Sequence, residues 1–262
     1  DDTRLAPEMP SDRIGGSGWR LLRTAALEAG VEAATADHPD RTRLAVVLGG
    51  HGETPLFDTM LALCAAADDP ISGGRHKVFG SQSLWVPPQT STIASHLPKA
   101  VGCAYALARM DRLGLVPSMP SDSVVVCSFG DASVNHATAQ AGLTAAAAAQ
   151  MHRQPCPILF VCEDNGLGIS VRTPRDYIER CYSNRPGLSY FAVDGCGVLA
   201  EAWDGVAEAI RTCRDQRRPV FLHVRTARLL GHAGSDVETT YLSTDEIEAN
   251  EARDPILAVA DQ

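Results

Sequence analysis

Four short runs of apolar residues, separated by helical stretches, constrain the fold more than any other feature of the 262-residue sequence. Each run is continuous rather than alternating, which is typical of strands buried on both faces of a parallel sheet. Strand–helix alternation of this kind predicts an α/β fold, a parallel sheet flanked by helices. The expected strands span Leu44–Leu48, Val124–Phe129, Ile158–Cys162 and Val220–Val224.

The segments between these runs carry apolar residues at helical spacing. The alanine run Ala145–Ala149 indicates close packing of its helix rather than a function. Two segments are expected to be surface loops: Arg172–Leu188, and the Gly/Ser/Thr-rich Gly231–Tyr241, which should be mobile. The expected helices span Trp19–Ala34, Thr59–Ala67, Pro98–Leu113, His136–Met151 and Val198–Cys213.

The composition excludes several classes of protein. With 45% hydrophobic and 21% charged residues, disordered, collagen-like and coiled-coil chains are ruled out. No stretch reaches the roughly 20 uninterrupted apolar residues of a membrane helix, and no signal-peptide pattern opens the chain. A net charge of −9 without a basic block argues against nucleic acid as the main partner. The eight cysteines form no Cys-x-x-Cys pair, so we expect reduced, mostly buried thiols in a cytoplasmic protein.

Polar residues follow two of the expected strands, in the segments Ser128–Ser133 and Cys162–Gly168. Ligands of open α/β sheets bind at the carboxyl ends of the strands, so both segments should reach one edge. Asp131 offers an anionic oxygen and Asn165 a neutral one, while the turn around Gly166 can aim a backbone carbonyl inward. This set of oxygens suits Mg²⁺, which also binds phosphate oxygens.

The backbone amides of Ala132 and Ser133 should lead into a helix N-terminus, which favours phosphate. Taken alone, Gly-Asp after a strand is common and Asp-Asn-Gly is an ordinary turn signal. The two signals become specific when they occur together, in this order, after two strands that are connected by one helix.

This pair resembles the thiamine diphosphate motif, which begins Gly-Asp-Gly and ends Asn-Asn about one βαβ unit later. Here it stands as Gly130-Asp131-Ala132 and Asp164-Asn165. An alanine therefore replaces the third glycine, and an aspartate replaces the first asparagine. The asparagine that binds the metal in that motif is retained.

Two further segments narrow the resemblance to a family. Thr90–Gly102 is similar to the segment before the first long helix in 2-oxo acid dehydrogenases, in the alpha subunit of the decarboxylating component (pyruvate or branched-chain type). Arg228–Asp236 resembles the Arg-Tyr-x-Gly-His-x-x-Ser-Asp loop of those subunits. The resemblance runs from about Gly73 to the C-terminus. It implies the thiamine diphosphate-binding fold, with residues 1–262 as one domain or as part of a longer fused alpha-beta chain.

The resemblance also implies roles for individual residues. Asp131 and Asn165 would bind Mg²⁺ with their side chains, and Leu167 would bind it with its backbone carbonyl. His232 would act in proton transfer near the diphosphate, although an ordinary loop histidine is the alternative. His96 could line the site entrance, but packing at a helix start is the favoured interpretation. The residues implied to bind the cofactor are Ser91, Ile93, Gly130, Asp131, Ala132, Ser133, Asn165, Leu167 and His232.

The implied activity is thiamine diphosphate-dependent oxidative decarboxylation of a small 2-oxo acid, with reductive acylation of a lipoyl group on an acyltransferase component. In that family a beta subunit, or a fused beta domain, supplies the carboxylate that activates the aminopyrimidine. The sequence holds no second strand set for such a domain. We therefore expect half of an active site, within a hetero-oligomer or a homodimer of a fused chain.

Three alternative functions compete with this one. A transketolase-like subunit shares the cofactor motif, but the loop Arg228–Asp236 favours the dehydrogenase. A non-catalytic subunit that kept the fold stays open because of Ala132, Asp164 and the Gly-Gly of Gly49–Gly52, where relatives have a Tyr-Arg pair. A Rossmann-type nicotinamide dehydrogenase would need Gly-x-Gly-x-x-Gly after a strand, which Gly49–Gly52 does not match.

Overall fold

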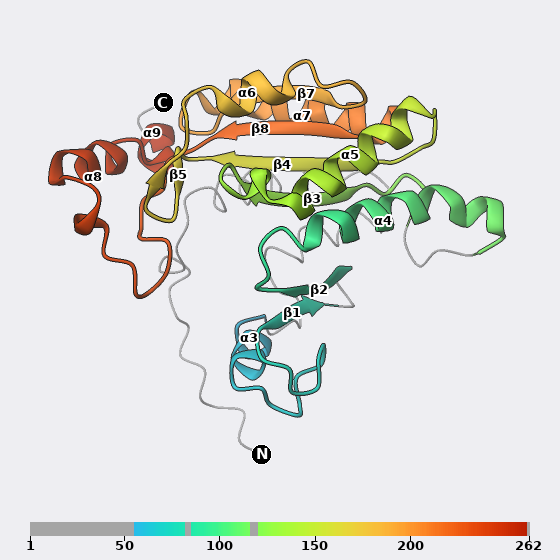
Figure 1. Cartoon of the computed structure of the whole chain (residues 1–262), viewed down its shortest axis with the longest axis horizontal. Helices are drawn as coiled ribbons and strands as arrows, with labels where there is room; N and C mark the ends of the chain where they lie inside the picture. The colour runs from blue at the N-terminus through green and yellow to red at the C-terminus, as the bar shows by residue number, and fades with distance from the viewer. Residues whose placement is uncertain (1–54, 82–84, 116–119, 261–262) are drawn as a thin grey trace.

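The centre of the molecule is a four-stranded sheet in the order β3-β4-β8-β7, in which all neighbouring strands are parallel. A computed structural model describes residues 55–81, 85–115 and 120–260. Helices lie on both faces of the sheet (Figure 1), which confirms the expected α/β class. The strands are β3 (Val125–Gly130), β4 (Ile158–Asp164), β7 (Ser189–Asp194) and β8 (Val220–Arg225).

One face of the sheet packs against α4 (His96–Met110), α5 (Ala137–Met151) and α6 (Tyr177–Tyr182). The Phe221 ring lies in the middle of this core, stacked on Tyr182 with 4.4 Å between the ring centroids. Helices α4 and α5 approach closely because α5 presents small residues to α4: a Cβ added at Gly142 would lie 3.1 Å from Leu97. The alanine-rich sequence of α5 therefore serves close packing, as expected.

The other face packs against α7 (Leu199–Gln216), whose buried Ala209 and Cys213 contact side chains of β4, β7 and β8. Gly205 of α7 faces β7, where a Cβ would lie 2.6 Å from Cγ1 of Val193. The two faces together bury β4 and β8 almost completely, which explains their continuous apolar sequences.

Smaller elements surround this core. Helix α3 and the antiparallel hairpin β1–β2 precede α4, whereas the short hairpin β5–β6 follows β4 at the end of the sheet where α8 and α9 also lie (Figure 1). These elements are α3 (Pro55–Leu63), β1 (Val78–Ser81), β2 (Val86–Thr90), β5 (Leu167–Gly168), β6 (Val171–Arg172), α8 (Thr244–Glu251) and α9 (Pro255–Ala260). Single turns of 3₁₀ helix are η3 (Asp111–Leu113), η4 (Ser133–Asn135) and η5 (Glu238–Thr240).

The sequence expectations are largely confirmed where the structure describes them. Strands β3, β4 and β8 and helices α4, α5 and α7 closely match the expected ranges, while α3 begins and ends four residues before Thr59–Ala67. The expected elements Leu44–Leu48 and Trp19–Ala34 lie outside the described residues. Helix α6 interrupts the expected loop Arg172–Leu188, because Ile178 and Tyr182 bury their side chains on the sheet.

None of the described helices is long and apolar enough to cross a membrane. All eight cysteines are free thiols, as expected. The expectation that most of them are buried is only half right, because four are buried, two are partly buried, and Cys64 and Cys181 are exposed.

Candidate functional site

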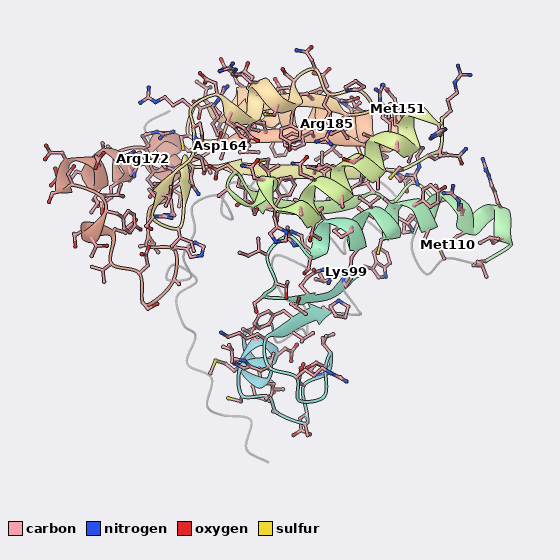
Figure 2. The ribbon with its side chains drawn as sticks, in the orientation of Figure 1. Lys99, Met110, Met151, Asp164, Arg172 and Arg185 are labelled. Atoms are coloured by element: carbon pink, nitrogen blue, oxygen red, sulfur yellow. The ribbon has the colours of Figure 1, made fainter. Side chains whose placement is uncertain are left out.

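The carboxyl ends of β3 and β4 bring the two halves of the sequence motif together. The parallel register pairs Gly130 with Glu163, and the amide of Asp131 donates a 3.1 Å hydrogen bond to the carbonyl of Glu163. Asp131 and Asp164 therefore leave the sheet side by side, with Asn165 as the next residue. Figure 2 shows Asp164 at the same end of the sheet as Arg172 of the β5–β6 hairpin.

Asp131 is a buried carboxylate, with only 2% of its surface exposed. Its Oδ2 accepts a hydrogen bond from the hydroxyl of Thr173. Burial raises the pKa of Asp131 above its ordinary value; the hydrogen bond from Thr173 offsets part of the rise, and the charge of Asp164 adds to it. Within the described ranges, no Lys, Arg or His forms an ion pair with this carboxylate.

The turn after β4 is shaped by two side-chain hydrogen bonds. Oδ1 of Asp164 accepts from the amide of Gly166 at 3.1 Å, and Oδ1 of Asn165 accepts from the amide of Leu167 at 3.0 Å. Gly166 has a φ of 77°, a left-handed conformation that glycine adopts without strain. The amide of Thr173 closes the hairpin on the carbonyl of Gly166 at 3.0 Å. The motif aspartate and the turn are thus joined through one residue, Thr173.

The donor set at this edge fits Mg²⁺. A carboxylate, a side-chain amide oxygen and a backbone carbonyl are the hard oxygen ligands that this ion prefers. A buried carboxylate with a raised pKa also gains from a nearby divalent cation, because the cation compensates the charge that burial disfavours. No group of three or more His, Cys, Asp or Glu side chains is placed to hold a metal in the described part of the chain, so a zinc-type cluster is absent there.

Ala132 and Ser133 stand at the start of the single 3₁₀ turn η4, with Ala132 as its N-cap. Their amides therefore lead into the N-terminus of a short helix, as expected, although the long helix α5 begins only at Ala137. Oγ of Ser133 donates a 2.7 Å hydrogen bond to the carbonyl of Gly130. Ala132 also touches the hairpin: a Cβ added at Gly168 would lie 2.8 Å from the Cβ of Ala132.

Ser91 and Ile93 lie in the connection between β2 and α4, and both are exposed, Ile93 by 60%. The next residue, Ala94, is buried in the core with a φ of 60°. His96 begins α4, and its Nε2 lies 2.8 Å from the carbonyl oxygen of Ser128 in β3. His96 therefore anchors this connection to the strand that ends in the motif, which agrees with packing at a helix start.

His232 lies in an exposed loop that is organised by Asp236. Oδ2 of Asp236 accepts hydrogen bonds from the amide of His232 at 2.7 Å and from the hydroxyl of Tyr241 at 2.6 Å. The Tyr241 hydroxyl holds the pKa of Asp236 below its ordinary value, and the His232 amide adds to this effect. Arg228 bonds to Tyr241 and also to the hairpin after Asn165. The loop and the turn are therefore connected, while the His232 side chain stays exposed to solvent.

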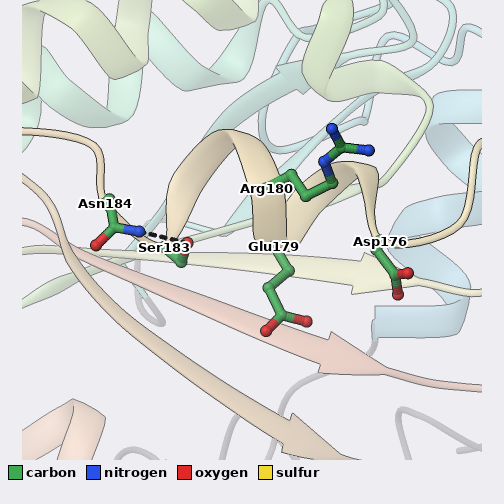
Figure 3. A pocket seen from close by; sticks show the side chains of 5 residues that line it. All are labelled: Asp176, Glu179, Arg180, Ser183 and Asn184. Carbon is green, nitrogen blue, oxygen red and sulfur yellow. Dashed lines mark hydrogen bonds between the residues drawn. The ribbon is translucent and has the colours of Figure 1, made fainter.

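The hollow drawn in Figure 3 lies elsewhere, on the outer side of α6. None of the expected site residues lines it; its lining residues are Asp176, Glu179, Arg180, Ser183 and Asn184. The candidate site is therefore an open edge of the sheet in the described part of this chain, rather than this hollow.

Three residues at the site were not singled out from the sequence: Thr173, His223 and Tyr190. Nε2 of His223 lies 2.8 Å from Oδ2 of Asp164, and Nδ1 lies 2.7 Å from the hydroxyl of Tyr190. The bond from His223 holds the pKa of Asp164 below its ordinary value, although burial opposes it. One signal for His223 existed in the sequence, because a histidine inside the apolar strand Val220–Val224 needs polar partners.

The fold and the edge site define an α/β protein with an oxygen-rich edge at the carboxyl ends of two parallel strands. Comparison with known families identifies the particular family: the profile of the family described as "Dehydrogenase E1 component" matches residues 27–262. The chain belongs to the dehydrogenase E1 component family, which confirms the resemblance seen in the sequence.

Individual relatives agree with this assignment. The alpha subunit of mitochondrial 2-oxoisovalerate dehydrogenase from Mus musculus is 29% identical over 232 residues, covering 84% of this chain and 49% of the relative. The corresponding subunit from Bacillus subtilis is 29% identical over 205 residues, covering 76% of this chain and 58% of the relative. The chain thus spans about half the length of the curated relatives it matches. Among solved structures, a transketolase from Leishmania mexicana has a TM-score of 0.46 at 15% identity, covering 80% of this chain and 35% of that one.

Proposed function

We propose that this chain is the alpha-type part of a thiamine diphosphate-dependent 2-oxo acid dehydrogenase. The enzyme decarboxylates a small 2-oxo acid and transfers the remaining acyl group to a lipoyl group of an acyltransferase component. The names of the relatives make 2-oxoisovalerate the first substrate to test. We also propose that this chain is located in the cytoplasm.

The observation that carries the proposal is the buried carboxylate of Asp131 beside the turn that begins at Asp164. It is 2% exposed, its pKa is raised by burial, and no positively charged side chain among the described residues forms an ion pair with it. Mg²⁺ held by Asp131, Asn165 and the carbonyl of Leu167 would supply a positive charge there. The same ion would compensate the charge of the cofactor's diphosphate at these residues.

Thiamine diphosphate supplies a nucleophilic carbon and an electron sink, the chemistry that removes CO₂ from a 2-oxo acid. The chain itself contributes binding and proton transfer. Gly130, Ala132 and Ser133 would approach the diphosphate, and Ser91 and Ile93 would line the rest of the cofactor. His232 would donate or accept a proton during transfer to the lipoyl group, since an imidazole changes protonation near neutral pH.

A second protein part completes the proposed site. The exposure of Ile93 and His232 supports a site that another surface covers, because a reaction of this kind excludes water. We propose a beta-type subunit or a fused beta domain as that part. The assembly would be a hetero-oligomer, or a homodimer if the two parts share one chain.

Calorimetric titration with thiamine diphosphate and Mg²⁺ tests the proposal, with the beta-type part present. We expect saturable binding that EDTA abolishes, and release of CO₂ from 2-oxoisovalerate in the presence of an artificial electron acceptor. The Asp131→Ala variant should lose metal-dependent binding. The His232→Ala variant should bind the cofactor but transfer acyl groups slowly to lipoyl. Absence of cofactor binding by the wild-type assembly would support a non-catalytic subunit instead.

A further inference from the structure

A continuous chain of hydrogen bonds lies beneath the candidate site and runs between strands β4, β8 and β7. Asp164 at the end of β4 bonds to His223 of β8 at 2.8 Å, and His223 bonds to Tyr190 of β7 at 2.7 Å. Asp164 and His223 share one face of the sheet because both are offset by an even number of residues from apolar positions of the same core, Phe160 and Phe221. The chain is therefore built into the sheet and not into a surface loop.

The imidazole of His223 is fully enclosed, with 1% of its surface exposed. A buried polar side chain is stable only when its donors and acceptors are paired, and both ring nitrogens of His223 are paired. An ionised carboxylate can only accept, so Nε2 donates to Asp164. In the neutral ring Nδ1 then accepts from the Tyr190 hydroxyl, which fixes the orientation of the imidazole.

Asp164 is held from three directions. Its Oδ1 accepts from the amide of Gly166 at 3.1 Å, its Oδ2 accepts from His223, and its backbone carbonyl accepts from the amide of Thr226 at 2.8 Å. These contacts leave neither carboxylate oxygen of Asp164 without a protein donor. They also fix the orientation of the Asp164 carboxylate beside Asp131.

We propose that His223 is a positioning residue of the magnesium–diphosphate site, where it allows an aspartate to occupy the motif's first asparagine position. It supplies a hydrogen-bond donor to the carboxylate at position 164, and so fixes how that carboxylate, which also interacts with Asp131, lies in the turn. The turn then presents Asn165 and the Leu167 carbonyl, and Asp131 stays available to the metal. This inference rests on the proposed function, since it concerns the same metal site.

Removing the imidazole should disturb the turn in a specific way. Oδ2 of Asp164 would lose its donor, and the carboxylate, whose side chain is 23% exposed, would remain as a partly buried charge next to a second carboxylate, which is unfavourable. A neutral asparagine at position 164 would keep the bond from Gly166 to its Oδ1 and would not repel Asp131. The damage caused by removing His223 should therefore depend on the charge at position 164.

The test measures Mn²⁺ binding by electron paramagnetic resonance, with thiamine diphosphate present and with the chain assembled with its beta-type part. His223→Leu should weaken Mn²⁺ binding about 10- to 100-fold, the usual effect of losing a residue that orients a metal ligand. His223→Gln should bind nearly as well as the wild type, because its Nε2 can donate to Asp164. Asp164→Asn in the His223→Leu background should restore binding to within about fivefold, because an unpaired amide costs less than an unpaired charge.

Each outcome bears on the inference. Equal Mn²⁺ binding by His223→Leu and wild type would overturn it, as would a double variant that binds no better than His223→Leu. If His223→Leu does not fold, the double variant decides: near-normal binding supports the role, and failure to fold or bind contradicts it. A wild-type assembly that binds no Mn²⁺ in the presence of thiamine diphosphate refutes the proposed function itself. The Asp131→Ala variant provides the reference signal for the absence of Mn²⁺ binding.

Discussion

Nη1 of Arg228 donates a hydrogen bond of 2.7 Å to the carbonyl oxygen of Ile169, so the loop of His232 is tied to the hairpin that follows Asn165. The same guanidinium bonds to the hydroxyl of Tyr241 at 2.6 Å. Its side chain is only 12% exposed. The guanidinium of Arg228 thus joins the loop of His232, where proton transfer is expected, to the turn after Asn165, where the metal ion is expected.

Arg228→Lys should loosen the His232 loop, because a lysine has one ammonium group and cannot reach both partners in the fixed fork geometry. Each lost bond to a charged donor costs roughly 1.5–3 kcal/mol. Hydrogen exchange of the amides of Gly231–Tyr241 should become faster, and transfer to lipoyl should slow more than cofactor binding weakens. The matched control is Arg225→Lys, whose exposed ion pair with Glu179 should contribute little. Unchanged exchange in Arg228→Lys would show that the contact does not order the loop.

The sequence predicts three strands of the described four-stranded sheet, β3, β4 and β8, but not β7. Strands β4 and β8 are buried on both faces, so their continuous apolar runs identify them. In strand β7 the apolar run Tyr190–Val193 is only four residues long and only Val193 is buried, so the run does not stand out in the sequence. Helix α6 is absent from the sequence expectations for a different reason. A segment of six residues has too few turns for its helical periodicity to be recognised.

Some residues of the candidate site could be predicted from the sequence, and others could not. Asp131 and Asn165 follow expected strands, so a local motif was sufficient to single them out. Thr173 lies 42 residues after Asp131, and His223 lies 59 residues after Asp164. The pairing of β4 with β8 brings His223 to Asp164, and the β5–β6 hairpin brings Thr173 to Asp131; the sequence alone determined neither arrangement. The two residues that depart from the motif, Asp164 and Ala132, also have contacts distant in the sequence, with His223 and Gly168 respectively.

Gly168→Ala should damage the site through its contact with Ala132. The new Cβ would lie 2.8 Å from the Cβ of Ala132, closer than such atoms approach in proteins. Overpacking of this kind costs roughly 1–3 kcal/mol and should displace the turn that carries Asn165 and Leu167. Thermal unfolding and cofactor titration should both report the loss.

Ala132→Gly in the Gly168→Ala background is the matching test. It removes the opposing methyl group and should restore most of the lost stability and binding, because the pair then carries one methyl group, as in the natural chain. Gly102→Ala is a control for the general effect of glycine replacement, since a Cβ there meets nothing within 4 Å. If the double variant is as impaired as Gly168→Ala, the two positions are not coupled.

The cysteines should fall into distinct reactivity groups. Cys64 and Cys181 are exposed and should react with a disulfide reagent such as Ellman's reagent before the others. Burial raises the pKa of Cys127 and Cys213 to about 12 and of Cys156 to about 11, which leaves almost no thiolate at neutral pH. The thiols expected to react only after unfolding are Cys127, Cys156, Cys162 and Cys213. Rapid modification of all eight thiols in the folded protein would contradict this division.

Asp131→Asn should stabilise the metal-free protein at neutral pH while abolishing its metal binding. Burial raises the pKa of Asp131 in the folded state, so the stability it contributes is present at low pH and is lost as the pH rises through that pKa. The neutral asparagine avoids this loss and can still accept the hydrogen bond from Thr173. Denaturant unfolding in EDTA should therefore show a larger free energy of unfolding for the variant at pH 7. The difference should shrink as the pH falls below the ordinary aspartate value of 3.8, where the wild-type carboxyl becomes protonated in both states. A variant less stable than the wild type at pH 7 would show that the charge of Asp131 is compensated in the folded chain without a metal.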